Sequence, residues 1–365
     1  MDEKILNIIE KYKDISLIND YLESEYGKES IYKVGLATGY PGISIMLYEA
    51  YKITGNHDYY NRANVYLSET IKIISSSPMY STSLFSGSFG VIFALTHCSD
   101  NGRNYFNIIH SLLSQYDYIY EQQYNEVSNS INQKIFDDFL YDTISGYSGI
   151  LNTLLYVKDK YGDKIHEKLH NHIINCITIL EKIVVLAIHN DNFKEKNILN
   201  NLGMAHGITG VINSLVSAYN RGFDKQSNDF TLKEVRNFYL NNIKEVNYIK
   251  RIPNFVNEEL NHRDAWCYGT PGVAFCLKKI SELMKDKDLN KISMELLNTT
   301  LQRNVDERGL ISPTLCHGYS GIIAIAKNLD AKNIVDYYHQ KILDCFSSSE
   351  FGFYDLNMED NAVVK

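Results

Sequence analysis

The segment GYSGILNTL, at residues 146–154, is one of six copies of a single pattern along the chain. Each copy has Gly-x-x-Gly, then Ile or Val, then three residues and Leu, except that the last copy has Ala326 in the Leu position. One Gly-x-x-Gly says little, but six in register with the same apolar continuation indicate an internal repeat, which decides the architecture. The other five copies are GYPGISIML (39–47), GSFGVIFAL (87–95), GITGVINSL (207–215), GTPGVAFCL (269–277) and GYSGIIAIA (318–326).

The residues that follow each second glycine predict a helix. Apolar side chains recur there at helical spacing on nearly every face, so these helices should be buried. The glycines themselves suit a turn, by positive φ or by close backbone approach, and Pro41 and Pro271 suit the first helical positions. Charged amphipathic stretches lie between the repeats and predict outer helices. The clearest of them are residues 54–76, 162–186 and 281–303.

One inner and one outer helix fit each repeat, because the second glycines lie 48 to 62 residues apart. No alternating run bounded by hairpin turns predicts a strand. The predicted fold class is therefore all-α, an α/α toroid of stacked inner and outer helices, with an open solenoid as the alternative. We expect a single domain over residues 1–365, with 348–365 as an irregular tail. Its repeats open near residues 35, 83, 142, 203, 263 and 314.

Composition excludes several classes of protein. The chain has 365 residues, 44% of them hydrophobic and 22% charged, which excludes wholesale disorder. Its net charge of −8, without a Lys/Arg cluster, argues against a nucleic-acid partner. We expect no membrane-spanning run of about 18 apolar residues, and the N-terminal MDEKILNIIEKYKD lacks the apolar core of a signal peptide. The six cysteines have no framework spacing, so they should be thiols or metal ligands.

Metal-binding side chains occur just before the later glycine pairs. Five positions before the second glycine, the last two repeats have Cys267 and Cys316; one position further on, His206 and His317 occur in the fourth and sixth repeats. Equivalent positions of stacked repeats should lie on one rim. Two thiolates and an imidazole suit Zn²⁺ and leave its fourth tetrahedral position open, as in catalytic sites. The sequence thus predicts zinc on Cys267, Cys316 and His317, with His206 as a fourth ligand or an acid/base group.

Further candidates precede the glycine pairs. Asp142 lies seven residues before Gly149 and should reach the same rim, although a helix cap is the simpler role. Arg263 and Asp264 precede Cys267 and could form an ion pair or leave the guanidinium to bind an anion. The remaining cysteines are interpreted as small hydrophobic side chains: Cys98, Cys176, Cys276 and Cys345.

Three segments resemble the signature blocks of the lanthionine synthetase C-like family, the cyclases that install thioether rings in lanthipeptides. They are NLGMAHGITG (201–210), RDAWCYGTPG (263–272) and TLCHGYSG (314–321), and with the repeats the resemblance covers about residues 35–330. It implies an α/α toroid with zinc on Cys267, Cys316 and His317. It also implies acid/base roles for His206 and Asp142, and a role for Arg263 in orienting site residues or substrate.

The resemblance implies a reaction and its partners. A substrate cysteine would add, as a zinc-bound thiolate, to dehydroalanine or dehydrobutyrine of the same peptide, and an acid would protonate the resulting enolate. The implied partners are a dehydrated lanthipeptide precursor, a lanthipeptide dehydratase and an exporter complex. The implied location is the cytoplasm, with a peripheral place at the inner membrane face left open.

One departure from the family pattern concerns its seventh repeat. This chain shows six repeats, then an outer-helix-like stretch at 331–347 and SSSEFGFYDLNMEDNAVVK. We expect the tail or another subunit to cover the apolar surface left exposed, unless the chain is a shortened and weakened member.

Three other functions remain open. They are glutathione addition to dehydrated residues, a zinc-stabilised peptide-binding scaffold, and a glycosidase, which is disfavoured because no carboxylate pair recurs in the aligned positions.

Overall fold

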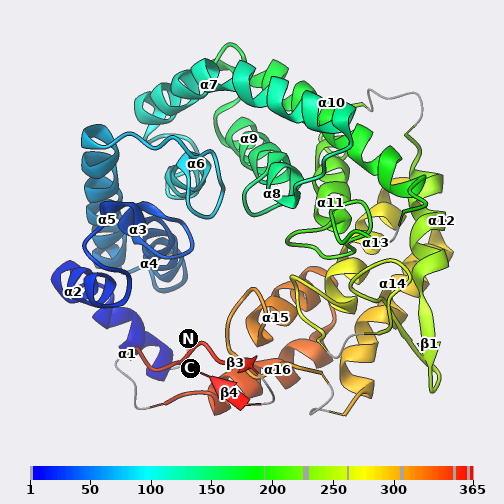
Figure 1. The fold of residues 1–365 in the computed structure, drawn as a ribbon. Helices are drawn as coiled ribbons and strands as arrows, with labels where there is room; N and C mark the ends of the chain where they lie inside the picture. Colours follow the sequence, from blue (N-terminus) through cyan, green and yellow to red (C-terminus); the bar gives the residue numbers. More distant parts are fainter. Residues whose placement is uncertain are drawn as a thin grey trace. The chain divides into compact units, whose positions relative to one another are not determined.

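The computed structural model describes residues 3–192, 194–224, 230–260, 263–304, 308–347, 351–359 and 362–364. Their contacts divide the chain into two compact units. Unit 1 comprises Met1–Gln133 and Ile144–Cys176, and unit 2 comprises Lys134–Thr143 and Ile177–Lys365. Both units are built mainly from α-helices (Figure 1).

Unit 1 contains the first three repeats, preceded by short helices. Its elements are α1 (Glu3–Lys11), α2 (Ile15–Tyr26), α3 (Ser30–Val34), α4 (Tyr40–Thr54), α5 (His57–Ser76), α6 (Ser88–His97), α7 (Phe106–Gln133), α9 (Tyr147–Tyr161), the 3₁₀ helix η1 (Asp163–Ile165) and the start of α10 (Leu169–Ile188).

Unit 2 contains the last three repeats. Its elements are α8 (Asp138–Tyr141), the rest of α10, α11 (Ile208–Tyr219), α12 (Leu232–Asn242), β1 (Lys244–Val246), β2 (Ile249–Arg251), α13 (Thr270–Met284), α14 (Lys287–Gln302), α15 (Tyr319–Asn328), α16 (Lys332–Asp344), β3 (Asn357–Glu359) and β4 (Ala362–Val364).

All six inner helices begin directly after the first glycine of the repeat, which is the N-cap residue each time. The second glycine lies within the first helical turn. A Cβ atom on Gly210 would come within 3 Å of the Met204 carbonyl oxygen, and one on Gly272 would do the same at Trp266. The second glycine is therefore needed for close backbone approach, whereas a positive φ occurs at the first glycine of the fifth repeat, Gly269.

The helices pack as the repeat predicts. Helix α4 packs against α5, α13 against α14 and α15 against α16, each pair one inner and one outer helix (Figure 1). Successive inner helices also pack on each other, in the order α4, α6, α9 within unit 1 and α11, α13, α15 within unit 2. The predicted outer helices at 54–76, 162–186 and 281–303 correspond to α5, α10 and α14.

Helix α10 corrects the expectation about apolar runs. By length and composition its residues Leu169–Ile188, with a mean hydropathy of 1.6 in their most apolar window, could cross a membrane. The sequence-based statement that no run approaches that length was therefore wrong. However, 56% of that window is buried inside the protein, and Leu180 and Ile183 are fully buried. A helix in the core of a folded domain has the same composition as a membrane-spanning helix, because each needs apolar side chains on most faces.

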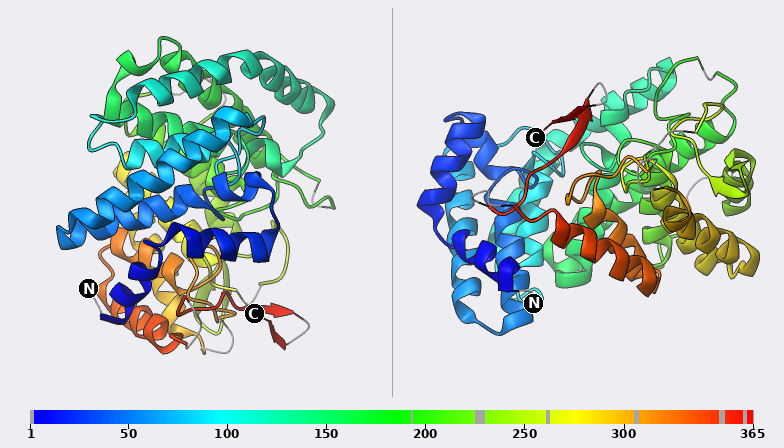
Figure 2. Two further views of the ribbon diagram at one scale, coloured as in Figure 1. Left: turned by 90° about the vertical axis from the view of Figure 1, so that its left-hand side faces the viewer. Right: turned by 90° about the horizontal axis from the view of Figure 1, so that it is seen from below.

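Two short antiparallel hairpins add to the helices in unit 2. Strands β1 and β2 are joined by Asn247 and Tyr248, both with positive φ, which gives the primed turn that matches strand twist. Strands β3 and β4 pair within the tail, which we had expected to be irregular. Figure 2 shows this second hairpin, in red, next to the C-terminus.

Candidate functional site

The loops before the inner helices are hydrogen-bonded to one another from repeat to repeat. In unit 2 the backbone N–H of Thr143 donates to Ala205 (3.0 Å), that of Met204 to Cys267 (2.9 Å), and that of Cys267 to Cys316 (3.1 Å). In unit 1 the corresponding bonds run from Ala37 to Phe85 and from Phe85 to Ile144. The bonds from Ala37, Phe85 and Cys267 join aligned positions of consecutive repeats, and those from Thr143 and Met204 begin one residue earlier. Within each unit the repeats are therefore stacked in the predicted order.

The thiols of Cys267 and Cys316 are in hydrogen-bond contact, and Cys316 is also in hydrogen-bond contact with the side chain of His317. The bond from Cys267 lowers the pKa of Cys316, and the neighbouring imidazole lowers it further. The same bond and burial raise the pKa of Cys267. Cys316 therefore loses its proton before Cys267 does. A cysteine must be a thiolate to bind a metal, so Cys316 is the thiol of the pair that is better prepared for it.

The chemistry of this donor set fits zinc. Two sulfurs and one imidazole nitrogen are donors that Zn²⁺ prefers, and three protein ligands leave one tetrahedral position for substrate. Cys267 is 4% exposed, while Cys316 and His317 are half-buried, so two of the three donor residues are partly accessible to solvent. Cys316 interacts with both Cys267 and His317, but the three donor atoms do not all lie within 4.8 Å of one another, as those of the Asp117 cluster do, so their zinc binding stays a prediction.

Asp142 and His206 form the second part of the site. His206 Nδ1 lies 2.5 Å from Asp142 Oδ2, and the carboxylate is fully buried at the C-terminal cap of α8. This hydrogen bond raises the pKa of His206, against the effect of burial, and a negative charge on Cys316 raises it further. With Nδ1 donating to Asp142, the ring presents Nε2 for proton transfer. Asp142 is thus both a cap residue and the partner of His206.

Arg263 and Asp264 have separate environments. The charge of Arg263 lowers the pKa of Cys267, so the guanidinium lies near the thiol pair. Asp264 is fully buried and pairs instead with Arg303 (2.6 Å) and, more distantly, with Arg251 (4.0 Å). The ion pair of Asp264 is therefore made with Arg303, and a role of Arg263 in binding an anion or orienting other residues stays a prediction.

Sequence reasoning missed three residues around His206. Asn201 Nδ2 donates to Tyr268 Oη (3.0 Å) and to the His206 carbonyl (3.1 Å), and lies 3.4 Å from Asp138 Oδ2. Burial raises the pKa of Asp138 to about 6. Asn201 opens the NLGMAHG block, so its position in that motif was a usable signal, whereas nothing in the sequence marked Asp138. Asp355, which contacts His317, was missed as well.

The other cysteines behave as expected. All six cysteines lie in the described residues and are free thiols. Burial raises the pKa of each of the four outside the candidate site, so these thiols are protonated at neutral pH. They are Cys98, Cys176 and Cys276, which are buried, and Cys345, which is half-buried.

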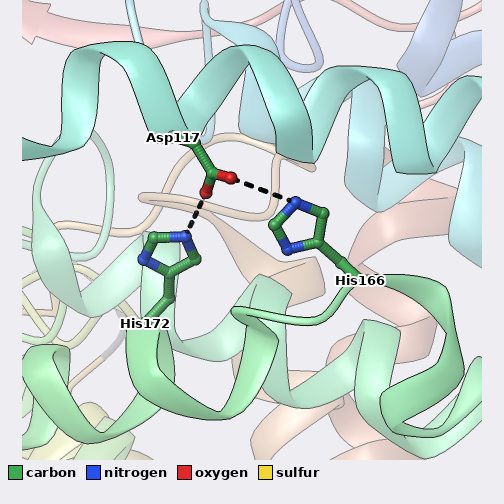
Figure 3. A group of neighbouring side chains, drawn as sticks. All are labelled: Asp117, His166 and His172. Carbon is green, nitrogen blue, oxygen red and sulfur yellow. Dashed lines mark hydrogen bonds and ion pairs between the residues drawn. The ribbon is translucent and has the colours of Figure 1, made fainter.

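A separate cluster in unit 1 joins α7 to the start of α10 (Figure 3). Asp117 accepts from His172 Nε2 (2.6 Å) and contacts His166 Nε2 (3.3 Å), and the three ligand atoms lie within 4.8 Å of one another, so they could hold a metal ion. Burial lowers the pKa of both histidines, which keeps the imidazoles neutral. The Lys168 backbone N–H donates to His166 Nδ1, so the His166 proton is on Nε2, facing the carboxylate. Asp117 therefore engages Nε2 of both histidines, whereas the buried Nδ1 of His172 has no hydrogen-bond partner among the described residues.

Residues 30–355 match the family model described as "Lanthionine synthetase C-like protein", and the chain belongs to that family. It is 27% identical over 310 residues to the nisin biosynthesis protein NisC of Lactococcus lactis subsp. lactis, covering 80% of this chain and 72% of that protein. Among solved structures it resembles nisin cyclase, with a TM-score of 0.75 and 21% identity over 95% of this chain and 89% of that one. The predicted fold class, an α/α toroid, is confirmed.

Proposed function

We propose that the protein is a zinc-dependent lanthipeptide cyclase that forms lanthionine and methyllanthionine rings. One observation carries the proposal. The thiol of Cys316 interacts with both Cys267 and His317, and it raises the pKa of His206, whose Nδ1 lies 2.5 Å from Asp142. A nucleophile site and a proton donor are thus available together in a chain of this family.

The thiol pair and His317 would hold the zinc. Zinc bound there would deprotonate a substrate thiol and present it as the nucleophile. Two thiolates and a neutral His317 would balance the charge of Zn²⁺. The cation would then withdraw less electron density from a bound substrate sulfur, which would stay nucleophilic. The positive charge of Arg263 near Cys267 favours the thiolate form of the pair.

His206 supplies the proton that completes the addition. The new bond joins the substrate sulfur to the β-carbon, the alkene π bond breaks, and the α-carbon takes a proton from His206 Nε2. The proton released by the substrate thiol restores the balance, so the reaction adds S–H across C=C without another reagent. Asp142 keeps His206 protonated and oriented, and a well-placed acid contributes about 10²–10⁴-fold to the rate.

The substrate class follows from this chemistry. It is a peptide that carries both cysteine and dehydrated Ser or Thr, so a lanthipeptide dehydratase must act first. We place this step in the cytoplasm, in a complex with that dehydratase and an exporter.

The test is to incubate purified protein with a dehydrated lanthipeptide precursor and to count free thiols by alkylation and mass spectrometry. Wild-type protein should contain about one zinc per chain and consume thiols, whereas Cys316→Ala should lose both properties. Cys276→Ala, which removes a buried thiol outside the site, is the matched control and should keep both. Full zinc content in Cys316→Ala would refute the ligand assignment. Zinc without thiol loss would favour a peptide-binding scaffold, and thiol loss only with added glutathione would favour glutathione addition.

A further inference from the structure

The imidazole of His317 contacts a carboxylate from the tail. His317 Nε2 lies 2.9 Å from Asp355 Oδ1. Asp355 belongs to residues 351–356, which follow the last outer helix, α16. A residue outside the six repeats thus contacts one of the three candidate ligands.

This contact decides which ring nitrogen is left for a metal. A carboxylate accepts a hydrogen bond, so the proton of a neutral His317 is placed on Nε2 and the lone pair on Nδ1. A metal ligand needs that lone pair. The hydrogen bond also makes Nδ1 more basic and fixes the orientation of the ring, as outer carboxylates do for zinc-bound histidines.

Asp355 is itself held in place by unit 2. Its Oδ1 also accepts from Ser312 Oγ (2.9 Å), a fully buried hydroxyl in the loop that leads to Cys316. The tail is anchored before Asp355 by the Ser347 N–H, which donates to the Gly352 carbonyl (2.8 Å). The rings of Phe346 and Phe353 also meet edge to face. The position of the Asp355 carboxylate is therefore fixed both by its hydrogen bond with Ser312 and by the contacts that hold the tail before it.

We infer that Asp355 is a positioning residue that orients His317 for zinc and makes its Nδ1 a stronger ligand. The inference rests on the proposed function, because it takes His317 to be a zinc ligand. An ordinary exposed ion pair would serve neither purpose, and at 60% side-chain exposure Asp355 would contribute little to stability as one. Its effect should instead be on the orientation and basicity of the His317 imidazole.

The test measures zinc affinity by competition with a chromophoric chelator. Asp355→Ala should weaken zinc binding by about 10–100-fold, the range found for outer partners of metal ligands. Asp355→Asn keeps an acceptor oxygen but loses the charge, so its loss should be smaller. Asp336→Ala, which removes an exposed carboxylate on α16, is the matched control and should bind as wild type.

A second background separates positioning from simple support of the fold. In His317→Cys protein, which keeps a third zinc ligand but has no imidazole ring, Asp355→Ala should weaken zinc binding no further, because its effect passes through the ring. The melting temperature of the zinc-free protein should be the same for Asp355→Ala and wild type. Equal losses in both backgrounds, or a lower melting temperature without zinc, would show a structural role and overturn the inference.

The outcomes also separate this inference from the proposed function. If wild-type protein binds no zinc, the ligand assignment fails and the inference with it. If wild-type protein binds zinc and Asp355→Ala binds it equally well, the inference alone is overturned.

Discussion

Replacing Asp142 with Asn tests whether a buried carboxylate sets the protonation state of His206. The substitution keeps the shape of the side chain and an oxygen that can accept from Nδ1, but removes the negative charge. In the wild-type protein the 2.5 Å bond to Asp142 is the largest cause of the raised pKa of His206. Without the charge, the pKa of His206 should fall.

The size of the change follows from the strength of the bond. A hydrogen bond to a charged group contributes about 1.5–3 kcal/mol, and about 1.4 kcal/mol corresponds to one pKa unit. The imidazole side chain is 34% exposed, so water screens part of this interaction and the lower end applies. We therefore expect Asp142→Asn to lower the pKa of His206 and to weaken the interaction that holds its proton by about 1.5 kcal/mol.

The assay is the pH dependence of cyclisation by zinc-loaded protein. His206 acts as an acid, so the rate should fall as pH rises through its pKa, and a raised pKa extends activity to higher pH. In Asp142→Asn this falling limb should move to lower pH, with zinc content unchanged. His206→Gln should lose the limb altogether. A limb at the same pH in Asp142→Asn would refute the reasoning.

Two further predictions concern stability. Gly210→Ala should destabilise the protein by about 1–3 kcal/mol, measured by urea unfolding, because the added Cβ would press on the Met204 carbonyl and the Thr143 hydroxyl; unchanged stability would contradict the close approach. Burial lowers the pKa of His172 and His166, so the folded state resists protonation and the free energy of unfolding should decrease as pH falls below about 6.5. His172→Gln should reduce that slope while leaving zinc content unchanged; loss of one metal equivalent would instead show that the Asp117 cluster binds metal.

Much of the fold was predictable from the sequence. The six glycine pairs identified the inner helices because each first glycine is an N-cap and each second glycine allows a carbonyl to approach. The β1–β2 hairpin was not predicted, since its turn uses Asn247 and Tyr248 in place of a glycine-containing pair. The character of α10 was misjudged because a few polar side chains interrupt a helix whose mean hydropathy is nevertheless high.

Part of the candidate site could also be predicted from the sequence, and part of it could not. Cys267, Cys316 and His317 could be grouped in advance, because a repeat turns equal positions in the sequence into neighbouring positions in space. The partnership of Asp142 with His206 joins loops 64 residues apart, and the sequence could place both on the rim but could not pair them. The Asp117 cluster lies outside the repeated positions, so no alignment of repeats could reveal it.

The sequence by itself determined the repeat, the class of helices that it builds and the sulfur and imidazole donors, because these depend on spacing along the chain. Only the tertiary structure decided which carboxylate each imidazole meets: Asp142 for His206, Asp355 for His317 and Asp117 for His172. Those pairings depend on the direction of side chains from loops and helices distant in sequence, and packing alone fixes that direction.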